Sequence, residues 1–143
     1  MIPLTPLYQT EFVTIEINPA LSFIQITWLQ QPSSELFRKE TKLLTDFALS
    51  NNYTNALFDI RNRNYLDMGD QNWLVGEIFP KLKGRRIRLA YLVSTAGLEI
   101  MDIFRVHDRV INNPDLEKHL EIDIFLDMED ALKWLLESKV PRP

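Results

Sequence analysis

The stretch NALFDI, residues 55–60, decides the fold of this chain. It is a short apolar run of the kind that forms a strand buried on both faces of a sheet. Two more such runs follow, IRLAYLV at residues 87–93 and IDIFL at residues 122–126. Because helical patterns separate the three runs, they predict parallel strands at the centre of a sheet.

Two longer runs precede this centre. Tyr8–Ile17 mixes apolar residues with Thr and Glu in near alternation, and Asn18-Pro19-Ala20 then breaks the run. Leu21–Leu29 again mixes apolar and polar residues. Alternation interrupted by turn residues predicts an antiparallel hairpin at the amino-terminal side of the sheet.

Four segments have apolar residues at helical spacing, at Ser34–Ser50, about Asp70–Phe79, about Ala96–Val110 and Met128–Lys139. Ser33 and Ser34 offer a hydroxyl cap to the first. Pro80 should bend or end the second, since proline has no amide to bond back to Gly76. The predicted order is β-β-α-β-α-β-α-β-α, an α/β fold whose mixed sheet has an antiparallel amino-terminal hairpin, a mainly parallel centre and flanking helices.

The composition is that of an ordinary globular domain. The chain has 143 residues, a net charge of -4, 45% hydrophobic residues and no cysteine. We expect one domain over residues 1–143 with an ordered core at about 8–139. Without cysteine there is no disulfide framework or thiolate metal site, so the cytoplasm is the expected compartment. No signal peptide and no membrane-spanning helix is expected.

The common catalytic and cofactor signatures are missing from the sequence. The four glycines form no phosphate-binding loop, and there is no G-x-S-x-G, H-E-x-x-H or EF-hand pattern. We therefore expect no enzyme activity, no cofactor and no metal. A pI of about 5.2 also lacks the basic footprint of a nucleic-acid binder.

Isolated polar residues have a structural reading beside a functional one. His107 continues the apolar stripe of the third helix, so it is either a ligand-pocket residue or a histidine at the edge of the core. Acidic groups cluster where helices should begin, which favours capping over metal binding. These groups are Asp67 with Asp70, Glu99 with Asp102, and Asp127 with Glu129 and Asp130.

A basic cluster lies between the second helix and the next strand. Lys81, Lys83, Arg85 and Arg86, followed by Arg88, could contact a membrane surface or an acidic partner. The alternative reading, which we prefer, is a solvated turn.

The loop from Asp59 to Asp70 is the best candidate site. It leaves the carboxyl end of a central strand and leads to a helix, which is where open α/β sheets place ligands. Arg61, Arg63 and Tyr65 alternate in this loop and form a set able to hold an anion or a partner's carboxylate. The alternative is a polar connection in which Arg61 pairs with Asp59. The predicted partner- or anion-binding residues are Arg61, Arg63, Tyr65, Asp67, Asp70 and Trp73.

Three passages, NALFDIRN, WLVGEIFPKLKGRRIRLAYLVS and DMEDALKWL, together with the element order, resemble the SpoIIAA-like group of the STAS domains, named after sulfate transporters and anti-sigma-factor antagonists. The similarity runs from about Phe12 to Leu136. It implies a non-enzymatic interaction domain with a sheet flanked by helices. The related CRAL-TRIO type of fold binds lipids in an apolar cavity.

The chain departs from this family at its regulatory serine. The antagonists carry an Asp-Ser-Ser/Thr-Gly stretch at the start of the second helix, whereas this chain has Asp67-Met68-Gly69-Asp70. Met68 stands where a hydroxyl is required. We therefore expect no phosphorylation switch there, although Asp70 could supply permanent negative charge.

Two functions follow as hypotheses. The first is a cytoplasmic protein-interaction or regulatory module, able to form a homodimer if Trp28, Trp73 or Trp134 proves exposed. The second is a carrier of a small apolar ligand or lipid under the third helix. That pocket would be lined by Ile100, Met101, Ile103, Phe104 and His107. An enzyme remains a third reading only if His107 and Asp108 converge with the Asp59–Asp70 loop.

Overall fold

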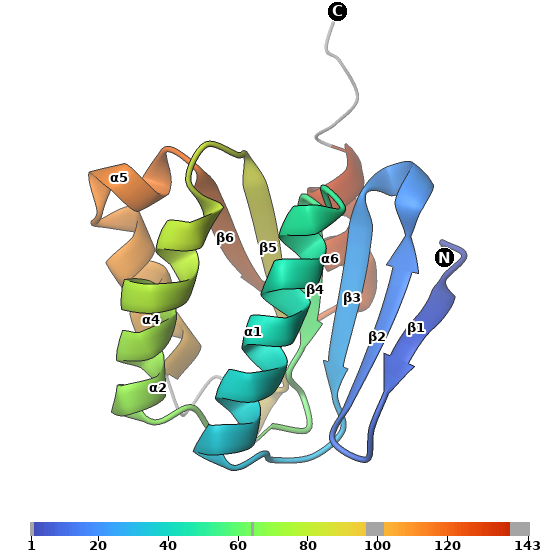
Figure 1. Cartoon of the computed structure of the whole chain (residues 1–143), viewed down its shortest axis with the longest axis horizontal. Coiled ribbons are helices and arrows are strands. Elements are labelled where there is room, and N and C mark those ends of the chain that lie inside the picture. The colour runs from blue at the N-terminus through green and yellow to red at the C-terminus, as the bar shows by residue number, and fades with distance from the viewer. Residues whose placement is uncertain (1, 64, 97–101, 138–143) are drawn as a thin grey trace, which may run out of the picture.

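Six strands form one mixed sheet, and their order in space is their order along the chain (Figure 1). The computed structural model describes residues 2–63, 65–96 and 102–137. The first three strands pair antiparallel and the remaining neighbours pair parallel, which confirms the predicted mixed sheet. The strands are β1 (Thr5–Gln9), β2 (Val13–Asn18), β3 (Phe23–Trp28), β4 (Asn55–Asp59), β5 (Ile87–Leu92) and β6 (Leu120–Phe125).

The single strand predicted over Tyr8–Ile17 is wrong, because the chain turns back within it. The backbone amide of Thr10 donates to the carbonyl of Val13 at 2.9 Å. The Thr10 hydroxyl accepts from the amides of Phe12 and Val13, each at 3.1 Å. These bonds close a turn between β1 and β2, so the sheet has one strand more than predicted. β1 is a largely exposed edge strand, a position that tolerates Pro6.

The helical segments follow the predicted order, with two short additions among the described residues, at Pro19–Leu21 and Pro114–Glu117. They are η1 (Pro19–Leu21), α1 (Ser34–Ser50), α2 (Met68–Trp73), η2 (Leu74–Ile78), η3 (Phe79–Leu82), α4 (Asp102–Ile111), α5 (Pro114–Glu117) and α6 (Met128–Glu137). α1 has the predicted bounds, and the Ser33 side chain caps it by accepting from the amide of Leu36. The short α5 was not predicted. The Asn113 side chain starts it by accepting from the amides of Asp115 and Leu116.

The second helix changes form along its length. It begins at Met68 because the Asp67 side chain caps it. It then widens to a π turn, η2, and tightens to a 3-10 turn, η3, that holds Pro80. The bend predicted at the proline therefore takes the form of a change in helix type, and the helical segment continues to Leu82.

The third helix, α4, is described from Asp102 onward. The predicted start near Ala96 and the residues Glu99, Ile100 and Met101 fall in or beside a segment outside the described residues. The buried face of α4 holds Ile103, Val106 and Val110. Ile111 is 45% exposed, so the stripe predicted to include it was wrong at that end.

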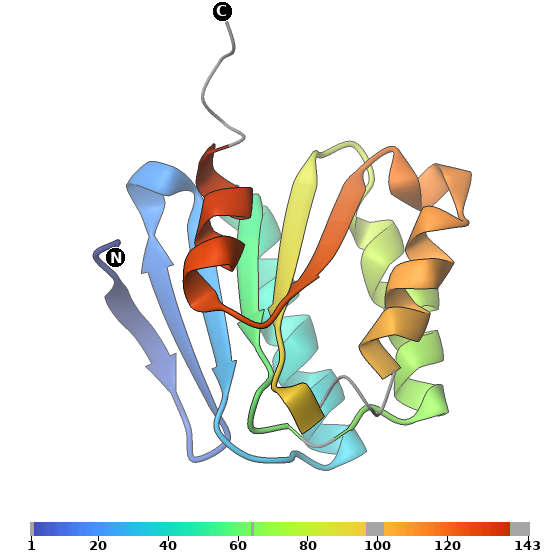
Figure 2. The ribbon, with the colours of Figure 1, turned by 180° about the vertical axis from the view of Figure 1, so that it is seen from behind.

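Helices cover the two faces of the sheet unequally. α1 and the α2–η3 segment lie over one face with α4 beside them, and α6 lies over the other (Figures 1 and 2). α6 packs against β4, β5 and β6. The larger hydrophobic cluster is on the α1 side, and a smaller one around Phe23, Leu57 and Leu135 is on the α6 side. Because β3 to β6 are parallel, their carboxyl ends share one edge of the sheet, and the loop from β4 to α2 begins there.

Candidate functional site

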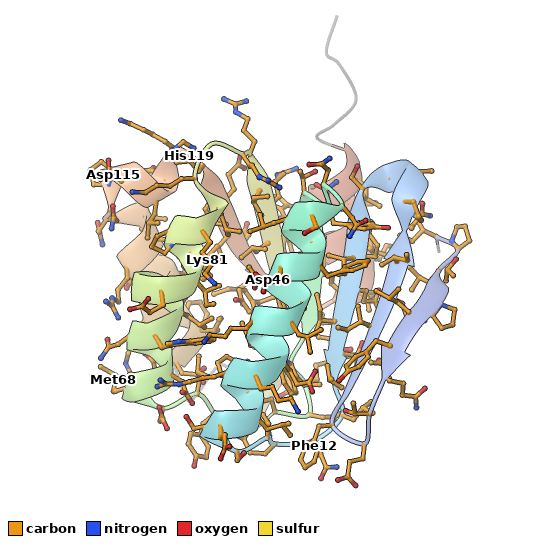
Figure 3. The ribbon with its side chains drawn as sticks, in the orientation of Figure 1. Phe12, Asp46, Met68, Lys81, Asp115 and His119 are labelled. Atoms are coloured by element: carbon orange, nitrogen blue, oxygen red, sulfur yellow. The ribbon has the colours of Figure 1, made fainter. Side chains whose placement is uncertain are left out.

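The candidate site is the loop that joins β4 to α2, at the carboxyl edge of the sheet. The buried Ile60 anchors its first turn by donating its amide to the carbonyl of Leu92 at 3.0 Å. Asp67 closes the loop by accepting the amide of Asp70 at 2.7 Å. Met68 marks the loop end of the second helix, far from His119 at the opposite edge (Figure 3).

Arg61 is paired within the loop. Its Nε lies 3.0 Å from Asp59 Oδ1 and its Nη2 lies 2.8 Å from Asp59 Oδ2. The Asp59 carboxylate also accepts the backbone amide of Arg61 at 3.2 Å. The bonds to Asp59 raise the pKa of Arg61. The pairing of Arg61 with Asp59 is the structural alternative that the sequence analysis left open. The Asp59 carboxylate therefore already balances the charge of Arg61.

Arg63 has the opposite environment. It is only 8% exposed, and its guanidinium carbon lies 5.6 Å from the centre of the Phe37 ring. Within residues 2–63, 65–96 and 102–137, no side chain or carbonyl forms a hydrogen bond or ion pair with this guanidinium. Burial lowers the pKa of Arg63, and the negative charges of Asp102, Asp70 and, in its ionised form, Tyr91 oppose that shift. Among the described residues, therefore, this buried cation of the loop has no bonded counter-ion.

The acids near Arg63 are bonded elsewhere. Asp70 Oδ1 accepts from the hydroxyl of Ser34 at 2.7 Å and from Arg38 Nε at 2.8 Å. Asp102 accepts the amide of Leu66 with one oxygen and the amide of Ile103 with the other. Both carboxylates thus hold secondary-structure elements together, and neither lies within ion-pair distance of Arg63 in the described structure.

Arg63 lines a polar pocket of about 100 Å³. The start of α1 contributes Ser33 and Ser34, and the loop contributes Tyr65 and Asp67. Gln31 fixes the loop against α1, because its side chain donates to the carbonyl of Tyr65 at 3.0 Å and accepts the Tyr65 amide at 3.1 Å. A cation that has no bonded partner in the described part of the chain, and that lies beside hydroxyls and a helix start, is chemically suited to an anion.

A second, apolar cavity of about 60 Å³ lies under α1. Its walls come from α1, the η2–η3 segment and the facing strands, with Leu44, Ile78 and Leu89 as examples. Phe37 and Arg63 line this cavity and the polar pocket as well. The two side chains therefore form the partition between a polar and an apolar space.

Tyr91 brings a hydroxyl to the apolar cavity. Its ring stacks on Phe58 with the ring centres 5.2 Å apart, as expected for cross-strand neighbours. Burial raises the pKa of Tyr91 to about 12. The phenol is therefore neutral at physiological pH and adds no negative charge beside Arg63.

Four of the six residues predicted for the site line the polar pocket, namely Arg63, Tyr65, Asp67 and Asp70. Arg61 and Trp73 do not. The Trp73 ring lies under the Arg38 guanidinium at 5.4 Å and meets the edge of Phe37 at 6.1 Å.

Sequence reasoning missed Phe37 and Gln31, and read Ser33 and Ser34 only as a helix start. The motif Pro32-Ser33-Ser34 did carry the information that the first helix begins near this edge.

Of the residues predicted for an apolar pocket under the third helix, the three that the structure describes, Ile103, Phe104 and His107, line neither of these two spaces. Ile103 is part of the core, at 1% exposure. Phe104 and His107 line a shallow depression with Asp123 and Asp127. Ile100 and Met101 lie outside the described residues. His107 thus lines a different hollow from the pocket at the Asp59–Asp70 loop.

The basic cluster lies at the other edge of the sheet, where β5 begins. Lys81, Lys83 and Arg86 are exposed. Arg85 donates to the carbonyl of Leu49 at 2.6 Å. Arg88 donates to the carbonyl of Trp134 at 2.6 Å. The last two arginines therefore tie helices to the sheet.

No tryptophan forms an exposed aromatic surface. Trp28 is 1% exposed and belongs to the core. Trp73 and Trp134 are partly buried beneath the guanidinium groups of Arg38 and Arg88. A homodimer stays a prediction, and these side chains give it no contact surface.

Acidic residues act as caps where helices begin, as the sequence predicted for Asp67 and Asp127. In the described part of the chain no group of three or more acidic or histidine side chains is placed to hold a metal ion. Across the same residues, none of the helices has the length and apolar character needed to cross a membrane.

The chain matches no protein-family model, no curated protein and no solved structure. The resemblance to the STAS domains therefore stays a prediction from the sequence. The class that the structure itself defines is an α/β domain with a six-stranded mixed sheet and a buried arginine at its carboxyl edge.

Proposed function

We propose that this chain is a non-enzymatic, cytoplasmic protein-interaction module of the STAS kind, and that its partner presents an acidic group to the polar pocket at the carboxyl edge of the sheet. Arg63 receives that group. Because Met68 replaces the hydroxyl residue of the phosphorylated family members, the partner binds without a phosphorylation switch at the second helix.

The single observation that carries this proposal is Arg63, which is 8% exposed and has no bonded partner among the described residues. Removing a charged group from water costs several kcal/mol unless partners replace the lost hydration. A side chain that lowers stability is retained where a function requires it. Binding an anion in the pocket would supply the contacts that the guanidinium lacks.

The surroundings of the pocket support recognition of a protein surface. Tyr65, which lines the pocket, is 54% exposed, and Met68, the residue after the lining residue Asp67, is 58% exposed. Aromatic and methionine side chains are enriched at protein interfaces.

Two arginine variants test this function. Tagged wild-type protein, Arg63→Met and Arg61→Met are each used for affinity purification from the native cell, and the bound proteins are quantified by mass spectrometry. We expect at least one partner that wild type and Arg61→Met retain equally and that Arg63→Met loses. Arg61→Met is the matched control, since it removes the same charge from the same loop.

Partner recovery that is the same for Arg63→Met as for wild type contradicts the assignment of the pocket. Equal loss with both variants contradicts it as well, because the loss then reflects the charge of the loop and not the pocket.

A second candidate function is transport of a small apolar ligand, favoured by the cavity under α1. Its volume of about 60 Å³ sets a limit on the cargo. A cavity that admits benzene measures about 150 Å³. The space is therefore too small for a lipid chain, and native mass spectrometry that finds a lipid bound to purified protein would contradict this limit.

A further inference from the structure

The polar pocket and the apolar cavity share a wall. Phe37 and Arg63 line both spaces, and the guanidinium lies over the aromatic ring at 5.6 Å. Rotation of these two shared side chains would join the two spaces. One ligand can then place an anionic group beside Arg63 and an apolar group behind Phe37.

The charges of the pocket select a single carboxylate. Arg63 has no bonded partner among the described residues, whereas Arg38 is bonded to Asp70. Asp67, which caps α2, lines the pocket together with Asp70, so two carboxylates lie beside Arg63 and one of them is neutralised by Arg38. These acids repel the double charge of a phosphate group more strongly than the single charge of a carboxylate, so the carboxylate is the better fit.

The volume selects the apolar group. The space of about 60 Å³ is less than half of the about 150 Å³ that holds the six carbons of benzene. It suits a branched side chain of about three or four carbons, such as that of valine or leucine. An internal aspartate or glutamate does not fit this pattern, because its carboxylate is the end of the side chain and nothing apolar lies beyond it.

We propose that the pocket binds the carboxyl-terminal residue of a partner protein, with the terminal carboxylate on Arg63 and an apolar side chain in the cavity under α1. This inference rests on the proposed function and specifies its partner. A chain end carries its carboxylate and its side chain on the same carbon, which matches two adjoining spaces divided by two side chains.

The rim and the wall of the site fit this occupant. Tyr65 lines the pocket and is exposed, so it is available to the residues preceding the terminus, and the next exposed large side chain along the loop is Met68. Leu74 and Ile78, at the two ends of the π turn η2, line the apolar cavity. Short π segments occur frequently at functional sites, and this one can adjust its winding when a side chain enters.

Three fluorescein-labelled peptides test the proposal by fluorescence anisotropy. The first is a Gly-Ser hexapeptide that ends in leucine with a free carboxylate. The second is the same peptide as its terminal amide, and the third ends in glycine. We expect the free leucine peptide to bind about 10-fold more tightly than either of the others, the range expected for loss of a buried apolar group or a charge partner.

Variants assign the two halves of the site. Arg63→Met should reduce the leucine peptide to the affinity of its amide, and Arg61→Met should change it less than about twofold. Ala48→Leu fills the cavity from α1 and should reduce the leucine peptide to the affinity of the glycine peptide. Ala56→Val fills the cavity from β4 and serves the same purpose if Ala48→Leu does not fold.

Each contrary outcome has its own meaning. Equal affinity of the leucine and glycine peptides, unchanged by the cavity-filling variants, overturns the carboxyl-terminal inference. The proposed function, in which Arg63 binds an acidic group of the partner, is not contradicted by that result. Equal affinity of the free acid and the amide overturns the inference and the proposed function together. Isocaproate that displaces the leucine peptide at equal concentration overturns the choice of a chain end and makes a free small acid the ligand.

Discussion

Arg61 and Arg63 stand at the two ends of one short turn and have opposite surroundings. The Arg61 side chain is 48% exposed and holds Asp59 with two bonds, whereas Arg63 is 8% exposed and has no bonded partner in the described structure. The first contributes to the fold, since it neutralises a buried carboxylate. The second costs stability in the free protein. The difference teaches that the same residue type in the same loop is structural at one position and reserved for a ligand at the other.

The largest expected effect comes from removing the ring beneath Arg63. Phe37 packs against Trp28 and Trp73, at 5.9 Å and 6.1 Å between ring centres. We expect Phe37→Ala to lower the free energy of unfolding by about 3–5 kcal/mol, measured by urea denaturation, because it leaves a cavity in the core. Leu43→Ala, at a 47% exposed position of the same helix, is the control and should change it by less than about 0.5 kcal/mol. A change in the free energy of unfolding as small as that of the control would contradict the tight packing of the Phe37 ring beneath Arg63.

Alkaline pH tests the neutral neighbour of Arg63. Burial raises the pKa of Tyr91 from 10.0 to about 12 in the folded protein. The unfolded chain then loses this proton first, so stability is complete below pH 10 and falls as pH rises toward 12. The expected loss is about 1 kcal/mol by pH 11 and about 2–3 kcal/mol by pH 12. Urea denaturation from pH 9 to 11 should show a shallower fall for Tyr91→Phe, and equal slopes for the two proteins count against a buried phenol.

Arg63→Met should raise stability. Methionine keeps most of the apolar stem and removes the buried charge, so we expect the free energy of unfolding to increase by about 1–3 kcal/mol. Urea denaturation at neutral pH measures it. A variant that loses stability would show that the guanidinium already has a stabilising partner, and the contrast between the two arginines would disappear.

Arg61→Met should change stability in the opposite direction and by less. It leaves the Asp59 carboxylate, whose side chain is 8% exposed, without its two charge-assisted bonds. We expect a loss of about 1–2 kcal/mol, because the backbone amide of Arg61 still donates to the same carboxylate. An unchanged free energy of unfolding would mean that water replaces the guanidinium fully.

Much of the fold was readable from local patterns. α1 has the predicted bounds because a hydroxyl cap at Ser33 and a helical stripe agree with each other. β1 and β2 were predicted as one strand because the turn at Thr10 contains no Gly, Asn or Pro and is closed by a threonine hydroxyl instead. The extra α5 rests on an asparagine cap within a polar stretch that shows no helical periodicity.

The candidate site was readable only in part. The loop position at a strand end placed Arg63, Tyr65, Asp67 and Asp70 together. The alternation of Arg61 and Arg63 gave no sign that one is exposed and the other buried. That difference depends on Phe37 and the apolar cavity, which come from a helix distant in sequence and from side-chain packing that periodicity does not encode.

The most direct test of the central claim follows the arginine Nε–H signals by NMR while the leucine-ending peptide is added at constant ionic strength. The account predicts a saturable shift of the Arg63 signal and an unchanged Arg61 signal. Assignment of the two signals comes from Arg63→Met and Arg61→Met. An Arg63 signal that does not move, or two signals that move together in proportion to the added peptide, contradicts the claim that Arg63 is held for a ligand.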